Sequence, residues 1–203
     1  MNLIERVKNI LMTPKTEWEV IDGESATPMS LFTSYVLPLA LIGAVASFIG
    51  YGLIGFNVFG VKIGGINWGV AQAAVSFIGA VVTYFVSTYV IDALAPSFSS
   101  EKDINKSAQL VAYASTAAWV VAVVNIIPAL SILGLLGLYS IYLFYIGLPI
   151  LKKTPEEKKI VYMIVSALVI IVCAGIIGYI LNMIVYSFLG NPYAVGIENM
   201  FGR

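Results

Sequence analysis

The Lys and Arg residues of this chain are distributed unevenly between the segments that separate its apolar blocks. Five apolar blocks can be recognised, and the segments around them alternate between basic and non-basic. If each block crosses a membrane, nine of the eleven bases fall on one side: Arg6, Lys8, Lys15, Lys102, Lys106, Lys152, Lys153, Lys158 and Lys159. Only Lys62 and Arg203 fall on the other. The positive-inside rule places the basic side in the cytoplasm.

A membrane span requires about 20 apolar residues, because each helical residue rises about 1.5 Å and the hydrocarbon core is about 30 Å thick. The sequence predicts an all-α polytopic helix bundle with spans near residues 31–53, 68–94, 110–127, 135–151 and 160–189. Residues 1–30 are expected to be cytoplasmic and residues 190–203 to form a short external tail. An odd number of spans places the N-terminus inside and the C-terminus outside.

The composition agrees with a membrane protein and excludes several kinds of site. The chain is 60% hydrophobic and 11% charged, whereas soluble domains are about one-quarter charged. It has one cysteine, Cys173, and no histidine, which excludes an internal disulfide, His/Cys metal sites and His-based catalysis. The net charge of zero indicates no nucleic-acid partner. We therefore expect no enzyme activity, no metal and no cofactor.

The N-terminal segment predicts an amphipathic helix that is too short to span the membrane. Residues 2–13 place five apolar side chains on one face, with Glu5, Arg6, Lys8 and Asn9 on the other, and Pro14 follows. The helix could lie flat in the membrane interface or pack against the bundle, and its pattern fits both. Side chains expected at the membrane surface are Arg6, Lys8, Trp18, Lys152, Lys153, Lys158 and Lys159.

Polar residues inside the predicted spans are the candidates for a functional site. Span two carries hydroxyl and amide groups on one broad helical face, and spans three and five add others. The candidate residues are Gln72, Ser76, Thr83, Ser87, Asp92, Tyr113, Ser115, Asn125, Tyr179 and Asn182. They form either a polar pocket for a small solute or hydrogen-bonded contacts between packed helices.

We favour helix packing over a solute path, because almost no ionisable residue belongs to this polar face. The exception is Asp92, which lies close to the cytoplasmic end of span two. Its carboxylate could cap a helix or hold the following loop through Lys102 or Lys106.

Three stretches of the chain resemble the Ypt/Rab-interacting-protein (YIP) family. IDALAPSF at residues 91–98 resembles the family's acidic stretch after span two. LVAYASTAAWVVAVVNIIPAL at 110–130 resembles its third span, which contains a Gly-Tyr-Ser motif, and LYSIYLFYIGLP at 138–149 resembles the fourth span of bacterial members. The resemblance covers about residues 1–190 and implies five spans with a tight hairpin between the third and fourth.

The resemblance implies a role in membrane organisation, with three departures from the family pattern. Eukaryotic members act in traffic between the endoplasmic reticulum and the Golgi and bind Rab-type GTPases. Here Ala112 replaces the glycine of the motif, Ala114 separates Tyr113 from Ser115, and the N-terminal region is short. The short loops resemble those of prokaryotic members, for which a Rab-type GTPase is not expected as a partner and the plasma membrane is the expected location.

Two hypotheses for the function follow from the sequence. The first is a non-enzymatic membrane scaffold that organises the bilayer and assembles with itself or with other membrane proteins. The alternative is a transporter or channel for a small solute along the polar face of span two.

Overall fold

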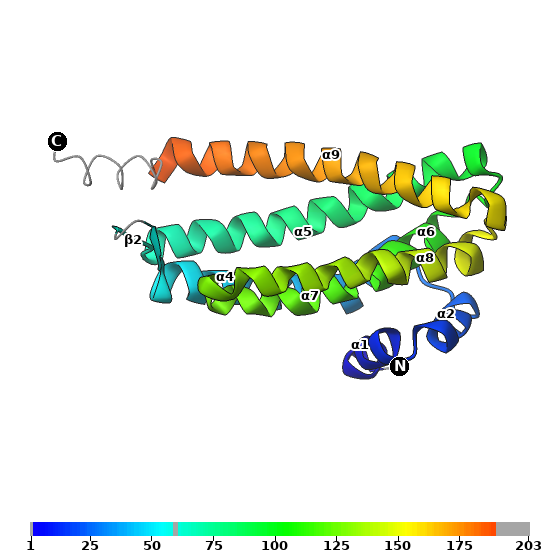
Figure 1. Ribbon diagram of the computed structural model, residues 1–203, viewed down its shortest axis with the longest axis horizontal. Helices are drawn as coiled ribbons and strands as arrows, with labels where there is room; N and C mark the ends of the chain where they lie inside the picture. The colour runs from blue at the N-terminus through cyan, green and yellow to red at the C-terminus, as the bar shows by residue number, and fades with distance from the viewer. Residues whose placement is uncertain (1, 59–60, 190–203) are drawn as a thin grey trace.

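The computed structural model describes residues 2–58 and 61–189 and is a bundle of long, roughly parallel helices (Figure 1). Five helical segments are long and apolar enough to cross a membrane: Pro28–Ile54, Ile66–Phe98, Ile104–Ile126, Pro128–Lys152 and Glu156–Leu189. The predicted all-α membrane bundle with five spans is therefore confirmed.

Two short helices precede the first span. Helix α1 (Leu3–Met12) begins after Asn2, whose side chain accepts a hydrogen bond from the Ile4 amide, and α2 (Pro14–Asp22) has Pro14 in its first turn. The apolar side chain of Ile10 is buried, and Leu3, Val7 and Leu11 pack against the core. Of the two arrangements open from the sequence, the structure thus has α1 packed on the bundle.

The first span contains two π-helical segments. It consists of α3 (Pro28–Leu31), the π-helical segment η1 (Phe32–Val36), α4 (Leu37–Ser47) and a second π-helical segment, η2 (Phe48–Ile54). Pro38 has no amide hydrogen, so it cannot complete the normal α-helical ladder, and the π segment immediately precedes it. The hydroxyl of Ser34 donates to the Ser30 carbonyl at 2.6 Å.

A small hairpin connects the first and second spans. Strand β1 (Phe56–Val58) pairs antiparallel with β2 (Val61–Ile63). Gly64 and Gly65 then adopt positive φ angles of 158° and 138°, which favour glycine, before α5 begins. Helix α5 (Ile66–Leu94) runs the length of the bundle and continues into the 3₁₀ segment η3 (Ala95–Phe98).

The third span is interrupted at Ser115 and changes from α-helical to 3₁₀ winding at Ala122. It contains α6 (Ile104–Ala114), α7 (Thr116–Val121) and the 3₁₀ segment η4 (Ala122–Ile126). Asp103 caps α6 by accepting hydrogen bonds from the Asn105 and Lys106 amides. Extended backbone at Ile127 then reverses the chain.

The fourth span begins as a 3₁₀ helix, η5 (Pro128–Leu138), and continues as α8 (Tyr139–Lys152). A loop was expected near residues 129–134, but these residues are helical, because Pro128 can occupy the first turn of a helix and the turn itself needs only Ile127. The fifth span is α9 (Glu156–Leu189). The predicted tail at 190–203 lies outside the described residues.

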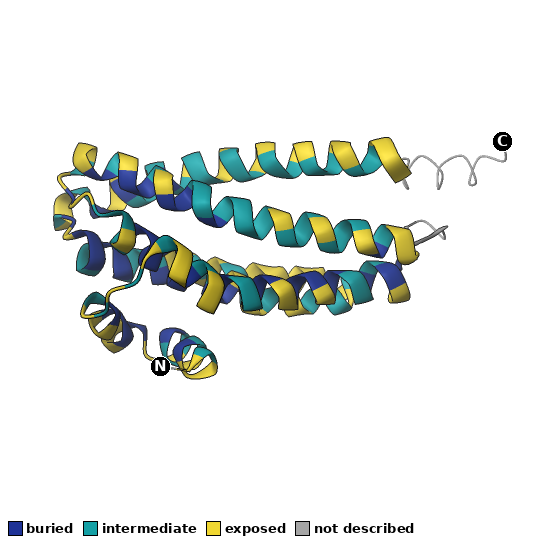
Figure 2. Cartoon of the chain, turned by 180° about the vertical axis from the view of Figure 1, so that it is seen from behind, coloured by how far each residue is buried: buried dark blue, intermediate teal, exposed yellow. Residues whose placement is uncertain are grey.

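The two ends of the bundle differ in character. We call the end that carries loop residues 99–103 and 153–155 the basic end, and the end that carries β1 and β2 the hairpin end. Helices α1 and α2 lie beside the bundle, nearer the basic end (Figure 1). Buried residues gather at the basic end. Away from that end, the residues of α9 are mostly intermediate or exposed (Figure 2).

Candidate functional site

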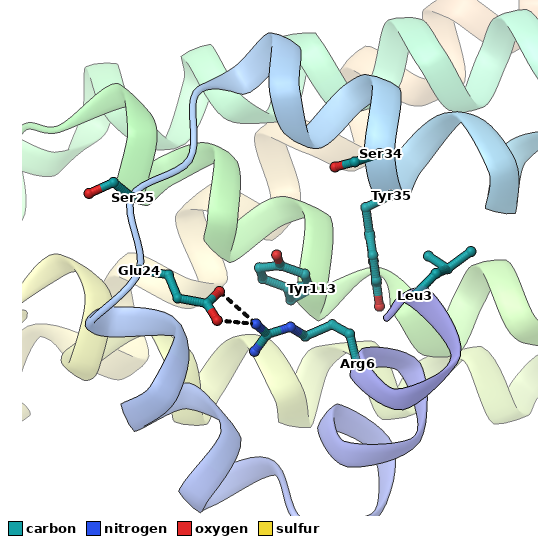
Figure 3. Close-up of a pocket in the computed structure, with 7 residues that line it drawn as sticks. All are labelled: Leu3, Arg6, Glu24, Ser25, Ser34, Tyr35 and Tyr113. Carbon is teal, nitrogen blue, oxygen red and sulfur yellow. Dashed lines mark hydrogen bonds and ion pairs between the residues drawn. The ribbon is translucent and has the colours of Figure 1, made fainter. Parts of the chain in front are cut away.

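A buried arginine joins three segments at the N-terminal part of the chain. Arg6 of α1 is only 5% exposed. Its guanidinium donates to Glu17 of α2 at 2.5 Å and to both carboxylate oxygens of Glu24, which lies between α2 and α3. Both bonds to Glu24 come from the same nitrogen, Nη2, while Nη1 binds Glu17, and hydrogen bonds between charged groups are stronger than neutral ones. One side chain therefore joins α1, α2 and the linker to the first span. Figure 3 shows the contact between Arg6 and Glu24.

Two tyrosines form the wall beside this arginine. The Tyr113 ring lies 5.2 Å from the Arg6 guanidinium carbon, and the Tyr35 ring stands edge-on to Tyr113 at 4.8 Å. The Tyr35 hydroxyl is 2.7 Å from that of Thr116. Together with the segments around Ser25 and Ser34, they enclose a polar cavity of about 320 Å³ (Figure 3).

The charge on Arg6 is stabilised by its partners. Burial acts to lower the pKa of its guanidinium, but the hydrogen bond to Glu24 and the negative charges of Glu24 and Glu17 outweigh it and raise that pKa. Arg6 is thus a permanently charged structural group, and it is not available for proton transfer.

Asp22 at the end of α2 forms a second connection to the bundle. Its carboxylate accepts from Lys153 at 2.7 Å and lies 3.3 Å from the Lys106 ammonium. Burial acts to raise the pKa of Asp22, but the hydrogen bonds from Lys153 and Lys106 lower it below its usual value. Gln109 adds a hydrogen bond to the Glu24 carbonyl at 3.0 Å.

A glycine provides the seat for Trp18, which is fully buried. A Cβ atom added at Gly147 of α8 would lie 2.7 Å from the indole ring of Trp18 and 2.8 Å from Leu110. Only glycine therefore allows α2 to pack this closely on α8. We call α1, α2 and the connections made by Arg6, Trp18 and Asp22 the collar.

Asp92 belongs to a separate buried network at the basic end. The ammonium of Lys152 lies 3.4 Å from the Asp92 carboxylate, 2.7 Å from the Ser107 hydroxyl and 3.0 Å from the Asp103 carbonyl. The expectation that Asp92 holds the loop through Lys102 or Lys106 is thus wrong in its partner. Lys106 instead pairs with Asp22 of α2 at 3.3 Å.

Three of the predicted polar residues come together. Thr83 and Ser87 of α5 and Ser115 between α6 and α7 line a cavity of about 350 Å³ between α5, α6, α8 and α9. The same three residues line a neighbouring cavity of about 260 Å³ that Trp119 of α7 borders. The remaining lining of the larger cavity is almost entirely apolar.

The other predicted polar residues do not join this cluster. Ser76 lies against Gly43 of α4, and Asn125 lies against Gly50 near the hairpin end. Tyr179 is 72% exposed on the outside of α9, and the side chain of Asn182 donates back to the Gly178 carbonyl of its own helix. These residues and Gln72 line neither of the two cavities. The described residues therefore do not form a single polar path that joins spans two, three and five.

Four of the seven side chains predicted at the membrane surface are buried within the protein: Arg6, Trp18, Lys152 and Lys159. Their polar or aromatic groups contact other parts of the chain, and Lys159 lies 3.9 Å from the centre of the Tyr145 ring. Lys8 and Lys153 are exposed and Lys158 is half-buried, so a surface role for these three stays a prediction.

Sequence reasoning did not identify the acidic partners of the collar. Glu17, Asp22 and Glu24 lie in a stretch that was assigned only as a cytoplasmic segment. The sequence does contain an indication of these partners. Four acids occur between residues 17 and 24, and the only base close by is Lys15. Acids so close to a membrane with few local bases suggest partners elsewhere in the fold.

Comparison with known proteins identifies the family of the chain. The sequence matches the profile of the Yip1 domain over residues 8–178, which is well over half of the chain. The chain therefore belongs to the Yip1 domain family, as the resemblance predicted. No curated protein and no solved structure matches it.

Proposed function

We propose that this chain, as a Yip1 domain protein, is a non-enzymatic membrane-organising scaffold whose collar widens the cytoplasmic side of the bundle. The observation that supports the proposal is the position of the collar beside the helices, nearer the basic end (Figure 1). A body that is broader in one leaflet than in the other favours curved bilayer.

The orientation in this proposal rests on the distribution of bases. The basic end carries Lys102, Lys106, Lys153 and Lys158, so it faces the cytoplasm under the positive-inside rule. The N-terminus then lies inside and the C-terminus outside, in the plasma membrane of a prokaryotic cell.

The outer surface of α1 has the chemistry of a membrane interface. Ile4 and Met12 are each 74% exposed, and Lys8 and Lys15 are exposed beside them. Apolar side chains flanked by lysines partition to the boundary between headgroups and acyl chains, where anionic lipid attracts the lysines. The inner face of the same helix packs on the bundle, so α1 would be held at this depth.

The length of the helices leaves room for the collar. Helix α9 has 34 residues and is therefore about 51 Å long, well above the roughly 30 Å of the hydrocarbon core. The basic end would then project beyond the hydrocarbon, and the collar would occupy the layer beside it.

The transport alternative is not favoured by the cavities. The larger cavity is lined mainly by apolar side chains, and the polar side chains in its lining are those of Thr and Ser residues. A transported polar solute would leave many of its hydrogen-bonding groups without partners there.

The test compares the shape of vesicles that contain wild-type protein with vesicles that contain protein with a detached collar. Vesicles of phosphatidylethanolamine and phosphatidylglycerol would be imaged by electron cryomicroscopy. Arg6→Gln removes the charge that joins α1, α2 and Glu24, and Gly147→Val displaces Trp18 without changing any charge. We expect wild-type protein to produce smaller or tubular vesicles and both variants to lose most of this effect.

Lys102→Gln serves as the matched control, because Lys102 is exposed and lies outside the collar. Thermal unfolding in detergent checks that the spans of each variant remain folded. Vesicle shapes that are equal for the wild type and for both folded variants would contradict the proposal. Saturable uptake of a neutral solute that Thr83→Val abolishes would support transport instead.

A further inference from the structure

The larger of the two cavities lies between α8 and α9, in the part of the bundle that spans the membrane. Ile141 of α8 and Ile171 of α9 border it and are strongly exposed at the surface of the protein. The cavity is therefore a groove that opens sideways, between two helices whose outer surfaces face lipid. We call it the α8–α9 groove.

The floor of this groove carries hydroxyl groups that lack protein partners. The side chains of Thr83, Ser87 and Ser115 have no hydrogen-bond partner among the described residues. Ser87 is only 4% exposed and yet lines both cavities. A fourth hydroxyl, on Ser140, already accepts from the Ala118 amide at 3.1 Å. Because these hydroxyls line the groove and no group in the described part of the chain accepts their protons, they can donate hydrogen bonds to an oxygen atom of a ligand there.

The lining also specifies the charge of that ligand. No Asp, Glu, Lys or Arg borders the groove in the part of the chain that the structure describes. Lys159 lies just beyond the groove, on the side of the basic end. Its ammonium sits over the Tyr145 ring and joins α9 to α8 about one helical turn from Met163. The groove thus accepts an apolar chain with an uncharged oxygen, and charged groups remain outside it.

We propose that the α8–α9 groove binds one acyl chain of a membrane glycerolipid, whose ester carbonyl accepts hydrogen bonds from Ser87 and its neighbours. The surrounding bilayer supplies this molecule at high concentration and through the open side of the groove. An ester carbonyl is uncharged, accepts hydrogen bonds and is attached directly to an acyl chain, so it meets each requirement of the lining. The site is independent of the collar.

The test measures lipid binding to the purified protein by native mass spectrometry. Two probes are a diacyl phosphatidylglycerol and its dialkyl ether analogue, which has the same chains but no carbonyl groups. We expect the wild type to bind the ester lipid about 3- to 10-fold more tightly than the ether lipid, as the loss of one hydrogen bond implies. A Thr83→Val/Ser87→Ala variant should bind both lipids equally.

Ser76→Ala is the matched control, because Ser76 lies on the same helix but faces Gly43. Ala167→Phe fills the groove from α9 and should reduce retention of both lipids, while thermal unfolding shows that the variant is folded. Equal binding of ester and ether lipids to the wild type would overturn the proposal. So would unchanged retention in folded Ala167→Phe, or a dimer that this variant dissociates, because a second copy would then occupy the groove.

Discussion

At the basic end the helices are joined by charged side chains, whereas at the hairpin end they are joined by glycines and aromatic rings. Lys152 and Asp92 meet in a buried network between α8 and α5, and Arg6 holds the collar. At the hairpin end the Cα atom of Gly69 lies 3.1 Å from where a Cβ at Gly52 would be, and Trp68 stacks on Tyr186 at 6.0 Å.

The difference follows from the surroundings of each end. Lipid is as apolar as a leucine side chain, so burial in the bilayer gives helices little reason to associate, and close fit must align them. The basic end can combine charges with fit, because unpaired groups there can reach water during folding. The same bundle therefore depends on shape at the hairpin end and on shape combined with electrostatics at the basic end.

The largest effect should come from breaking the Asp92–Lys152 pair. Asp92→Asn or Lys152→Met alone leaves the other group buried and without its charge partner, which costs about 3–5 kcal/mol. The double variant should recover much of this loss, because no isolated charge remains. Thermal unfolding in detergent measures the change, and Lys102→Met, at an exposed position, should change little. A double variant as unstable as the two singles would show that the pairing itself is unimportant.

An intermediate effect should come from adding one methyl group at the hairpin end. A Cβ at Gly50 would overlap the carbonyl oxygen of Asn125, so Gly50→Ala should cost about 1–3 kcal/mol. Gly175 is the matched control, because nothing lies within 4 Å of its added Cβ. Gly175→Ala should be neutral or stabilise the helix by up to about 1 kcal/mol. Equal melting temperatures for the two variants would argue against shape as the organising factor at this end.

The smallest effect should be the response of the collar to acid. Because the pKa of Asp22 is lowered in the folded protein, its contribution to stability is present above the ordinary Asp pKa of about 3.9. That contribution is lost as the pH falls through the lower folded value. We expect the collar to loosen below about pH 4.

The distance between spin labels at Lys8 and Tyr142, in a chain with Cys173 replaced, would report this loosening. In Asp22→Asn the label distance should already be broader at neutral pH and should change less on acidification. A label distance that stays constant in the wild type down to pH 3 would remove Asp22 as a connection of the collar.

The sequence predicts the architecture well, because span number depends on apolar length and base distribution alone. The partners of individual side chains are harder to predict. The sequence marks Asp92 as an unusual acid, yet its partner Lys152 lies 60 residues away, in a segment whose lysines are expected at the membrane surface. The contact of Trp18 with Gly147 cannot be predicted from the sequence either. A glycine in an apolar span has many explanations, and only the fold brings this one against α2.

The polar residues show the same limit. Thr83 and Ser87 share a face of α5 with Ser76, and helical spacing predicts that much. Which neighbour each one meets depends on where α4, α6 and α9 approach α5. Ser76 meets Gly43, and Thr83 and Ser87 meet a groove.

The winding of η5 has a mechanical consequence for the fourth span. A 3₁₀ helix rises about 2.0 Å per residue and an α-helix about 1.5 Å, so the 11 residues of η5 extend about 22 Å instead of about 16 Å. Rewinding this one segment would shorten the span by roughly one α-helical turn and draw Ile127 toward the centre of the bilayer. The fourth span thus contains a built-in length reserve, with which an unchanged sequence can match hydrocarbon layers of different thickness.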